Sequence, residues 1–567
     1  MNTLNRIIFI FFVVNFTFVS AQFNYQRQWA TYSGGRGANY VLGAVDSQKN
    51  LITVGTISLL TQTPSYYNQF TTAGAYQPSM ASDEDLYIIK YSSDGVLIWA
   101  TYFGGAGFDN LYSFTLDADD NIYFSGQTGS AVGIATAGTY IPNFSPNTYS
   151  KNYLVKFNSN GMRQWGTYLP GACRALSLGA NNSIYAAGST RTAIAGLTNS
   201  GAYQENFQNL AGFDPNDYRN LNGYIVQLDT ATGNKINATY CGPYFEISSM
   251  ATDSAGNIIV GGSTNVFCLG TALSTQGAYQ ELQVNCVNYG SSLGTSDAVI
   301  SKFTSNLQTR LWSTYYGGIG SEGIGSLTTD GVDIYVSIGN SNNSILATAG
   351  TFQQTPSGTL VSKFNGAGNR LWATGFGDND TFVGGLSVLN NKLFFSGGVL
   401  ATTTFPIATS GAYQETIAGL TYINEYGNLQ TCYKGFFGQF NATTGASDWS
   451  SYYSGELYDF VGRMIVQDQN TFYLSGITSS ETGIATLGSH QPNISFANNV
   501  FPPDPIFYRT NHFLAKFSIP ALTTNSFSKT SLQLSPNPNN GIFSLGWVKV
   551  ANWFLKNYWL LRLVLKI

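Results

Sequence analysis

Carboxylates that could do chemistry stand a few residues after short glycine-containing turns in five separate parts of this 567-residue chain. They are Asp109, Glu246, Glu322, Asp378 with Asp380, and Glu456 with Asp459. Carboxylate oxygens coordinate hard cations such as calcium, and they accept hydrogen bonds from hydroxyl groups such as those of sugars. We therefore expect a ligand-binding set of Asp109, Glu246, Glu322, Asp378, Asp380 and Asp459, with calcium as the candidate ion. Solvated turn residues are the alternative, since carboxylates are mostly exposed in proteins.

Other residue types that carry catalysis are scarce. The chain has two histidines, His490 and His512, and neither has a cysteine or a second histidine at the spacing of a metal site. A nucleophilic serine on a sharp turn would need a strand followed by a helix, and no strong helix pattern is present. No catalytic residue and no metal ligand motif are therefore predicted. A hydrolase or lyase that uses a pair of carboxylates stays open, because such pairs meet in space and not in sequence.

The elements that must position these carboxylates are strands with the pattern Trp-x-Thr-Tyr, which returns seven times with imperfections. The copies begin at Trp29, Trp99, Trp165, Asn237, Trp312, Trp372 and Trp449. Self-similarity at a regular interval is typical of a repeat architecture. Each complete unit continues with a glycine turn, two short strands joined by a tight turn, a long connection and a third strand. The segments between turns are rich in β-branched and aromatic residues, which predicts hairpins of β-strands.

The long connection holds a second repeated element, Gly-Ala-Tyr-Gln. It occurs at residues 74–77, 201–204, 277–280 and 411–414, with a looser copy at 350–353. Near the C-terminus His490 replaces the tyrosine of this element, so we expect His490 to pack as that tyrosine does. The third strands end in Lys-Phe or a related pair, at Lys90-Tyr91, Lys156-Phe157, Gln227-Leu228, Lys302-Phe303, Lys363-Phe364, Gln439-Phe440 and Lys516-Phe517.

The number of third strands predicts how the repeat closes. The first Trp-x-Thr-Tyr strand has no third strand before it, and the third strand at Lys516-Phe517 has no Trp-x-Thr-Tyr after it. The N-terminal strand must therefore complete the last of seven units, which leaves no long unpaired sheet edge. An open solenoid would need atypical capping units, and none is visible. We predict an all-β, seven-bladed β-propeller of four-stranded blades over residues 22–519.

The repeated marks resemble a known family of bacterial propeller repeats, the SBBP type, whose units carry Tyr-x-Gly-Gly, Asp-x-x-Gly-Asn-x-Tyr-x-x-Gly-x-Thr and Lys-Phe. Matching residues in this chain include the glycine turn Gly104-Gly105, the turn Asp253 to Asn257, and Lys302-Phe303. The resemblance covers residues 25 to 518 or so and implies the propeller fold. It implies no substrate, because propellers host unrelated binding and catalytic roles.

Residues 1–21 have the composition of a cleaved export signal. Arg6 precedes the apolar run 7–14, and Val19-Ser20-Ala21 forms a small-residue cleavage site. Polar residues interrupt the run well short of a membrane span, so a retained anchor helix is the weaker alternative. We expect a mature protein that starts at Gln22, has no transmembrane span, and is secreted or lies on the outer cell surface.

The C-terminal part carries a second export signal. Residues 532–545 contain Pro536-Asn537-Pro538 and Gly541-Ile542-Phe543, and they resemble the opening of the type A C-terminal sorting domain of the type IX secretion system of Bacteroidetes. This resemblance implies the type IX secretion machinery as a partner. The polar segment 520–531 is the expected linker. Because the residues after 545 depart from the family pattern, we expect 532–567 to be a truncated or frameshifted sorting domain.

Composition limits the remaining partners and cross-links. The formal net charge of -4 leaves no basic surface for nucleic acid. Five cysteines in an exported chain cannot all pair internally. Cys268 and Cys286 fall in one long connection and are the disulfide candidate, since a bridge there would constrain the unfolded loop. Buried or free thiols are expected at Cys173, Cys241 and Cys432.

The long connections are where function is expected, because loops on a rigid scaffold tend to carry binding residues. In strands that run up and down, the Tyr-x-Gly-Gly turns and the Gly-Ala-Tyr-Gln connections leave the sheet on the same face. We therefore predict an exported, cell-surface or secreted propeller that acts as a binding scaffold for a glycan or for a surface or matrix protein. A polysaccharide-active hydrolase or lyase with loop carboxylates is the alternative, and a purely structural surface protein is the third.

Overall fold

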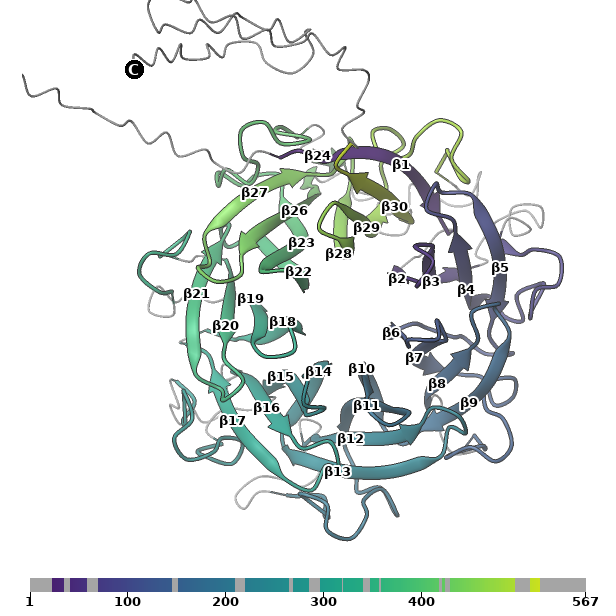
Figure 1. Ribbon diagram of the computed structural model, residues 1–567, viewed down its shortest axis with the longest axis vertical. Coiled ribbons are helices and arrows are strands. Elements are labelled where there is room, and N and C mark those ends of the chain that lie inside the picture. Colours follow the sequence, from purple (N-terminus) through teal and green to yellow (C-terminus); the bar gives the residue numbers. More distant parts are fainter. Residues whose placement is uncertain are drawn as a thin grey trace, which may run out of the picture. The chain divides into compact units, whose positions relative to one another are not determined.

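The computed structural model describes residues 23–34, 41–58, 70–144, 151–209, 220–264, 269–284, 296–318, 320–339, 347–355, 358–417, 421–423, 429–494 and 510–520. Seven four-stranded antiparallel sheets, the blades, stand in a ring around a central axis (Figure 1). The described residues form strands and no α-helix, so none of them belongs to a helix that could span a membrane. The seven-bladed β-propeller predicted from the sequence is confirmed.

Each blade begins with its innermost strand, and the strands follow outward. Blade 1 comprises β2 (Val41–Val45), β3 (Leu51–Ser58), β4 (Glu84–Tyr91) and β5 (Leu97–Phe103). Blade 2 comprises β6 (Ser113–Leu116), β7 (Ile122–Thr128), β8 (Lys151–Phe157) and β9 (Arg163–Leu169). Blade 3 comprises β10 (Ala172–Gly179), β11 (Ser183–Thr190), β12 (Asn222–Asp229) and β13 (Lys235–Pro243).

The second half of the ring repeats this order. Blade 4 comprises β14 (Phe245–Thr252), β15 (Ile258–Thr264), β16 (Ala298–Phe303) and β17 (Arg310–Tyr316). Blade 5 comprises β18 (Gly323–Thr329), β19 (Ile334–Gly339), β20 (Thr359–Phe364) and β21 (Arg370–Phe376). Blade 6 comprises β22 (Thr381–Leu389), β23 (Lys392–Leu400), β26 (Tyr433–Asn441) and β27 (Ser447–Tyr452), with a small hairpin of β24 (Thr421–Ile423) and β25 (Leu429–Thr431) in its long connection.

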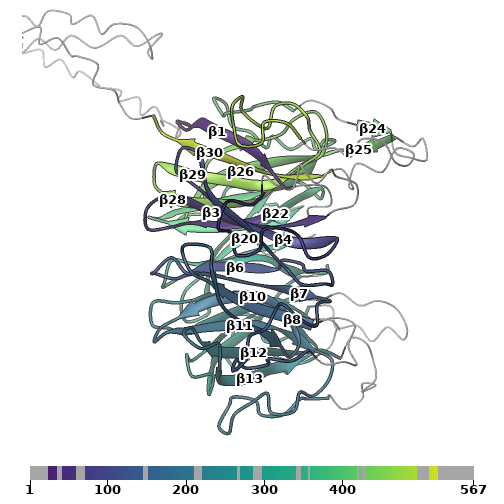
Figure 2. The same cartoon turned by 90° about the vertical axis from the view of Figure 1, so that its right-hand side faces the viewer.

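Blade 7 joins the two ends of the propeller, as the sequence predicts. Its inner strands are β28 (Asp459–Asp468), β29 (Thr471–Thr478) and β30 (Asn511–Ser518), and its outer strand is β1 (Gln26–Ser33). The pairing of β1 with β30 is antiparallel, with Ala30 opposite Ala515 and Tyr32 opposite Phe513. Figures 1 and 2 both show β1 lying along β30. Closure by the N-terminal strand is therefore confirmed.

The tryptophan of the repeated strand joins each blade to the next. Its indole Nε1 donates to a backbone carbonyl in the outer hairpin turn of the following blade. The pairs are Trp29 with Ser93, Trp99 with Ser159, Trp165 with Thr230, Trp312 with Gly366 and Trp372 with Ala442, at 3.0 to 3.3 Å. A glycine of the same turn lies against the indole, and a Cβ on Gly161 would stand 2.9 Å from the Trp99 ring. The turn glycine is therefore required by the close approach of the ring.

Two blade contacts depart from this scheme, and each is compensated. Blade 3 has Asn237 in place of the tryptophan, and the turn of blade 4 has the fully buried Leu307 in place of the glycine. Leu307 keeps the positive φ of 60° that the glycine would adopt, and its side chain packs in the core between the two blades. In blade 6, Trp449 meets Phe23 and Tyr25 instead of a turn, with ring centroids 4.9 and 5.6 Å apart.

The threonine of the repeated strand holds the Gly-Ala-Tyr-Gln element against the blade. Its hydroxyl accepts the backbone N–H of the glutamine at 2.8 to 3.0 Å. The pairs are Gln77 with Thr101, Gln204 with Thr239, Gln280 with Thr314, Gln353 with Thr374 and Gln491 with Thr31, and Ser451 serves Gln414 in the same way. The long connection and the glycine turn of one unit are therefore fixed next to each other.

His490 packs as the sequence predicts. In other units the tyrosine of the Gly-Ala-Tyr-Gln element stands edge-on to the aromatic residue that ends the third strand of the next blade, as Tyr76 does on Phe157 at 5.3 Å. The His490 ring meets Tyr91 in the same edge-on arrangement at 5.5 Å, and its Nδ1 lies 2.9 Å from the Tyr91 hydroxyl. A structural role for this histidine is confirmed.

The cysteines within the described residues are buried and free. They are Cys173, Cys241 and Cys432, as expected from the sequence. Burial raises the pKa of the Cys173 thiol to about 11, so this group stays protonated and unreactive near neutral pH. The disulfide candidate, Cys268 with Cys286, lies outside the described residues.

Candidate functional site

The innermost strands of five blades each carry a β-bulge at the same level of the ring. The ladder between the first and second strands shifts register around Arg174 in β10, Ser248 in β14, Gly325 in β18, Gly384 in β22 and Gly462 in β28. A bulge re-aims the side chain of the extra residue and is common next to binding sites. The level of these five residues is therefore where side chains enter the centre of the ring.

The residues at the five bulges fall into two groups. Blades 3 and 4 have Arg174 and Ser248 at the bulge, and both residues are exposed. Blades 5, 6 and 7 each have a glycine there. None of these glycines has a positive φ, and a Cβ on Gly462 would meet only the Ser475 carbonyl, at 3.6 Å. Neither backbone conformation nor crowding therefore demands a glycine at 462. Glycine inside a strand often marks a place where another group must approach closely.

A cavity of about 520 Å³ opens at this level. Its lining includes two guanidinium groups, one carboxylate and four aromatic rings, from Arg174, Arg463, Glu246, Tyr112, Phe382, Tyr458 and Phe460. The Arg174 guanidinium lies over the Tyr112 ring at 4.5 Å. Phe382 is 41% exposed, and its ring centroid lies 6.1 Å from that of Phe460. The cavity thus combines an excess of positive charge with accessible aromatic surface.

Glu246 is the one predicted acidic residue that lines this central cavity. Asp380 borders a neighbouring depression beside Phe382. The Asp378 carboxylate accepts hydrogen bonds from the hydroxyls of Thr381 and Thr403, at 3.1 and 2.7 Å. The structure therefore brings Glu246 close to the cationic cavity and leaves Asp378 bound within its own loop. Ligand binding by these three residues stays a prediction.

The other predicted carboxylates, Asp109, Glu322 and Asp459, are buried between blades and do not face the cavity. Each accepts the backbone N–H of the glycine four residues earlier. The distances are 2.7 Å from Gly105 to Asp109, 3.2 Å from Gly318 to Glu322 and 2.8 Å from Gly455 to Asp459. Burial raises the pKa of Asp109 to about 6 and the pKa values of Glu322 and Asp459 to about 7. The solvated turn residues considered as an alternative are therefore absent at these three positions.

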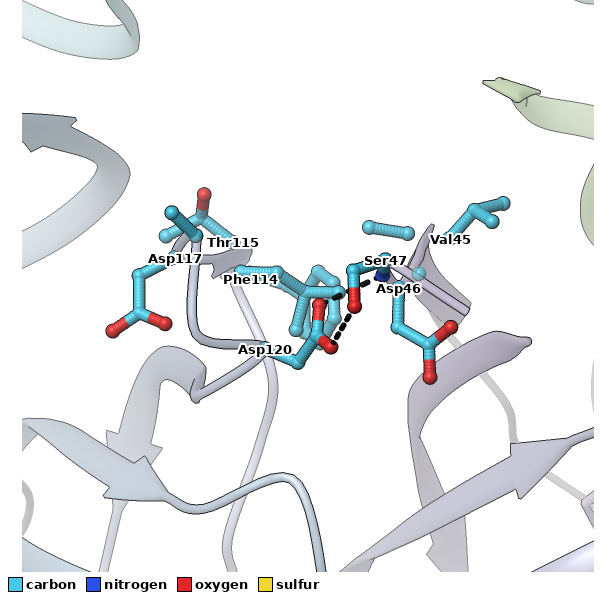
Figure 3. Close-up of a pocket in the computed structure, with 11 residues that line it drawn as sticks. Val45, Asp46, Ser47, Phe114, Thr115, Asp117 and Asp120 are labelled. Atoms are coloured by element: carbon cyan, nitrogen blue, oxygen red, sulfur yellow. Dashed lines mark hydrogen bonds between the residues drawn. The ribbon is translucent and has the colours of Figure 1, made fainter. Parts of the chain in front are cut away.

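A second cavity, of about 440 Å³, lies between the inner hairpin turns of blades 1 and 2 (Figure 3). Asp46, Asp117 and Asp120 line it, and all three already have partners. Asp120 points toward Ser47 and accepts from its backbone N–H and its hydroxyl, at 2.8 and 2.7 Å. Asp46 forms an ion pair with Lys90 at 2.8 Å, and Asp117 accepts from Asn121 and Tyr123. These carboxylates hold the turns together, and Lys90 balances the charge of Asp46.

Sequence reasoning missed the two arginines and the aromatic pair of the central cavity. Arg174 and Arg463 belong to the first strand of their units, which carries none of the repeated sequence marks. An alignment of the seven first strands would have marked them, because the units differ in that strand and agree in the others. It would also have shown the three glycines that stand at the same level.

The closed ring of seven four-stranded sheets defines the chain as a seven-bladed β-propeller. No family model and no curated protein matches the sequence.

Solved structures with a similar course of the chain include a protein of unknown function from Dyadobacter fermentans, at 9% identity and a TM-score of 0.34 over 88% of this chain and all of that one. The β-propeller domain of the Trilobed protease from Pyrococcus furiosus matches at 8% identity and 0.37, over 89% and 99%. The endosialidase of phage phi92 matches at 9% identity and 0.36, over 95% and 76%. Values this low carry no argument about what the chain does.

Proposed function

We propose that this protein is an exported, non-enzymatic propeller that binds a glycan rich in carboxylate groups in its central cavity. The observation that carries the proposal is the lining of that cavity, where Arg174 and Arg463 stand near the exposed Phe382 and the half-buried Phe460. A guanidinium binds a carboxylate through two parallel N–H donors. Aromatic rings offer a flat apolar surface on which the C–H face of a sugar can stack. Aromatic residues at the centre of a binding site commonly contribute most of the binding energy.

Binding without hydrolysis is supported by the carboxylate inventory of the cavity. Hydrolysis of a glycosidic bond ordinarily uses two carboxylates about 5 to 9.5 Å apart. Among the described residues that line the cavity, Glu246 is the one carboxylate. A single carboxylate cannot supply both the acid and the base of that mechanism, and beside two guanidinium groups it is suited to orienting a ligand. Export rests on residues 1–21 and 532–545, which lie outside the described residues.

The experiment compares retention on matched polymers. The chain from Gln22 is passed over immobilised polygalacturonate and over a neutral polysaccharide, with released sugar assayed in the same wells. We expect saturable retention on the polyuronate, weak retention on the neutral polymer and no release. Replacing both cavity arginines, Arg174→Gln with Arg463→Gln, should weaken binding at least about 100-fold, because two charge-assisted contacts are worth about 1.5 to 3 kcal/mol each.

The matched control is Arg191→Gln, which removes an exposed arginine outside the cavity and should leave binding unchanged. Equal retention of the double variant and the unaltered chain would contradict the proposal. Sugar release from the polyuronate would replace it with the hydrolase or lyase alternative.

A second prediction uses the open space beside Gly462. We expect Gly462→Leu to lower polyuronate affinity at least about tenfold, because the added side chain fills the side of the cavity that the glycines leave open. Unfolding should be little affected, since Gly462 does not have a positive φ and a Cβ there meets nothing closer than 3.6 Å. The measurement pairs the binding isotherm with the thermal midpoint. Gly462→Ala, which adds one methyl group, is the graded control and should stay within about twofold of the unaltered chain.

A further inference from the structure

Three junctions between blades place a buried charged residue from one blade opposite a buried carboxylate from the next. The first residue lies five positions before the end-of-strand lysine or glutamine of the third strand, and we call it the head residue. Head residue and carboxylate are Asp85 with Asp109 between blades 1 and 2, Asp297 with Glu322 between blades 4 and 5, and Lys434 with Asp459 between blades 6 and 7. All six side chains are almost wholly buried.

In two junctions the facing groups are both acidic and close together. The point where a Cβ on Gly317 would stand is 2.9 Å from Glu322 Oε2 and 3.0 Å from Asp297 Oδ2. The corresponding point on Gly104 is 2.8 Å from Asp109 Oδ2 and closer still to Asp85 Oδ1. The oxygens of each pair are therefore separated by no more than the sum of two such distances. Glycine is needed at both positions because a methyl group would occupy the space between the carboxylates.

The acidic pairs form no ion pair with a cationic side chain among the described residues. Asp297 Oδ2 accepts from Gln280 Nε2 and the Val284 N–H, and Glu322 Oε2 accepts from the Gly318 N–H. The other oxygens, Asp297 Oδ1 and Glu322 Oε1, are buried without a hydrogen-bond donor. Two carboxylates at this separation cannot both stay ionised in a buried place unless a cation or a proton joins them.

The junction between blades 6 and 7 shows which kind of group can face the buried carboxylate. There the head residue is Lys434, and its ammonium donates to the carbonyl oxygens of Gly455 and Leu457, at 3.0 and 2.6 Å. The facing Asp459 is saturated by the Thr478 and Ser480 hydroxyls and the Gly455 N–H. Gly455 and Leu457 stand four and two residues before the carboxylate, as Gly318 and Gly320 do before Glu322. One junction therefore carries its own cation where the other two carry a second carboxylate.

We propose that the junctions between blades 1 and 2 and between blades 4 and 5 each bind one calcium ion, held by Asp85 with Asp109 and by Asp297 with Glu322. The ion takes the role that the Lys434 ammonium has in the third junction. The backbone carbonyls that precede each carboxylate complete an all-oxygen set, which calcium accepts in irregular geometry and zinc does not favour. The described residues hold no cluster of three or more acidic, histidine or cysteine side chains, so backbone oxygens are essential ligands of these sites.

The test counts calcium ions by isothermal titration calorimetry on the chain from Gln22, after dialysis against EDTA at pH 7.5. We expect two sites, a rise in the thermal midpoint on saturation, and a weaker response to magnesium. Asp85→Asn and Asp297→Asn should each leave one site, and the double variant none. Asp120→Asn, on an acidic residue at an inner hairpin turn, is the control and should keep both sites.

Circular dichroism of each variant separates loss of a site from loss of the fold, and Glu322→Gln is the second variant if Asp297→Asn does not fold. Absence of calcium uptake by the folded chain would overturn the proposal, as would uptake that persists in the double variant. A stability that falls with rising pH and ignores calcium would also overturn it, because a shared proton would then join the carboxylates.

Discussion

A chain that begins at Gly34 should fail to unfold cooperatively, whereas a chain that begins at Gln22 should show one sharp transition. The shortened chain lacks strand β1 and the residues before it, and with them the buried side chains of Phe23, Tyr25, Trp29 and Tyr32. Burial of four such side chains contributes about 6 to 12 kcal/mol, and domains are stable by only about 5 to 15 kcal/mol in total. The shortened chain would also expose β30 as an unpaired edge. Urea unfolding followed by tryptophan fluorescence and far-ultraviolet circular dichroism measures both chains.

A synthetic peptide of residues 22–34 provides the control for this experiment. Added to the shortened chain, it should restore the transition in proportion to its concentration, because β1 binds through its ladder with β30. A shortened chain with an unchanged urea midpoint would show that blade 7 is stable with three strands.

The second large effect is a loss of stability in acid that depends on His512. This side chain is fully buried beside Tyr87, whose hydroxyl lies 2.8 Å from His512 Nδ1, and burial lowers its pKa to about 3. A histidine in the unfolded chain binds a proton near pH 6.5. Unfolding therefore takes up a proton between these two pH values, and the contribution of the neutral His512 is lost as pH falls below about 6.5. The loss is about 2 kcal/mol at pH 5.

The measurement compares urea midpoints from pH 7.5 to pH 5 in the unaltered chain and in His512→Gln, which keeps a hydrogen-bonding side chain beside Tyr87. The difference between the two curves isolates the histidine, because the carboxylates titrate equally in both. We expect the variant to lose the extra acid sensitivity. His490→Gln, on a partly exposed ring, should keep it, and parallel curves for His512→Gln and the unaltered chain would refute the assignment.

The fold could be predicted from the sequence because each repeated residue makes a contact that recurs around the ring. Trp165 donates to the turn of the next blade, Thr101 accepts the backbone N–H of Gln77, and Tyr76 packs on Phe157. These contacts constrain residue type at fixed spacing, so the pattern was visible in seven copies. The positions that differ between units, such as Arg174 and Gly462, line the cavity and make no contact that repeats around the ring. They carry no repeat signal, although they form the candidate site.

The predicted carboxylates show where sequence reasoning fails. Asp109 and Glu322 could be found because they follow a glycine turn, but the sequence does not show that they are buried opposite Asp85 and Asp297 of the preceding blade. Those partners are distant in the chain, and only the order of strands in the ring brings them together. The glycine turn predicted exposed loops, whereas the Gln280 side chain and the Gly318 N–H enclose the acidic pair.

The contact of each tryptophan with the following blade also determines which segment of this gene could have been copied during evolution. A duplicated blade would carry its tryptophan into a new neighbour and would need that neighbour to supply the turn glycine. At the junction of blades 3 and 4 both sides differ from the usual pair, with Asn237 in place of the tryptophan and Leu307 in place of the glycine. A copied module that spans the junction between two blades would carry both sides of this contact. A chain assembled from such modules begins and ends inside a blade, as the pairing of β1 with β30 requires.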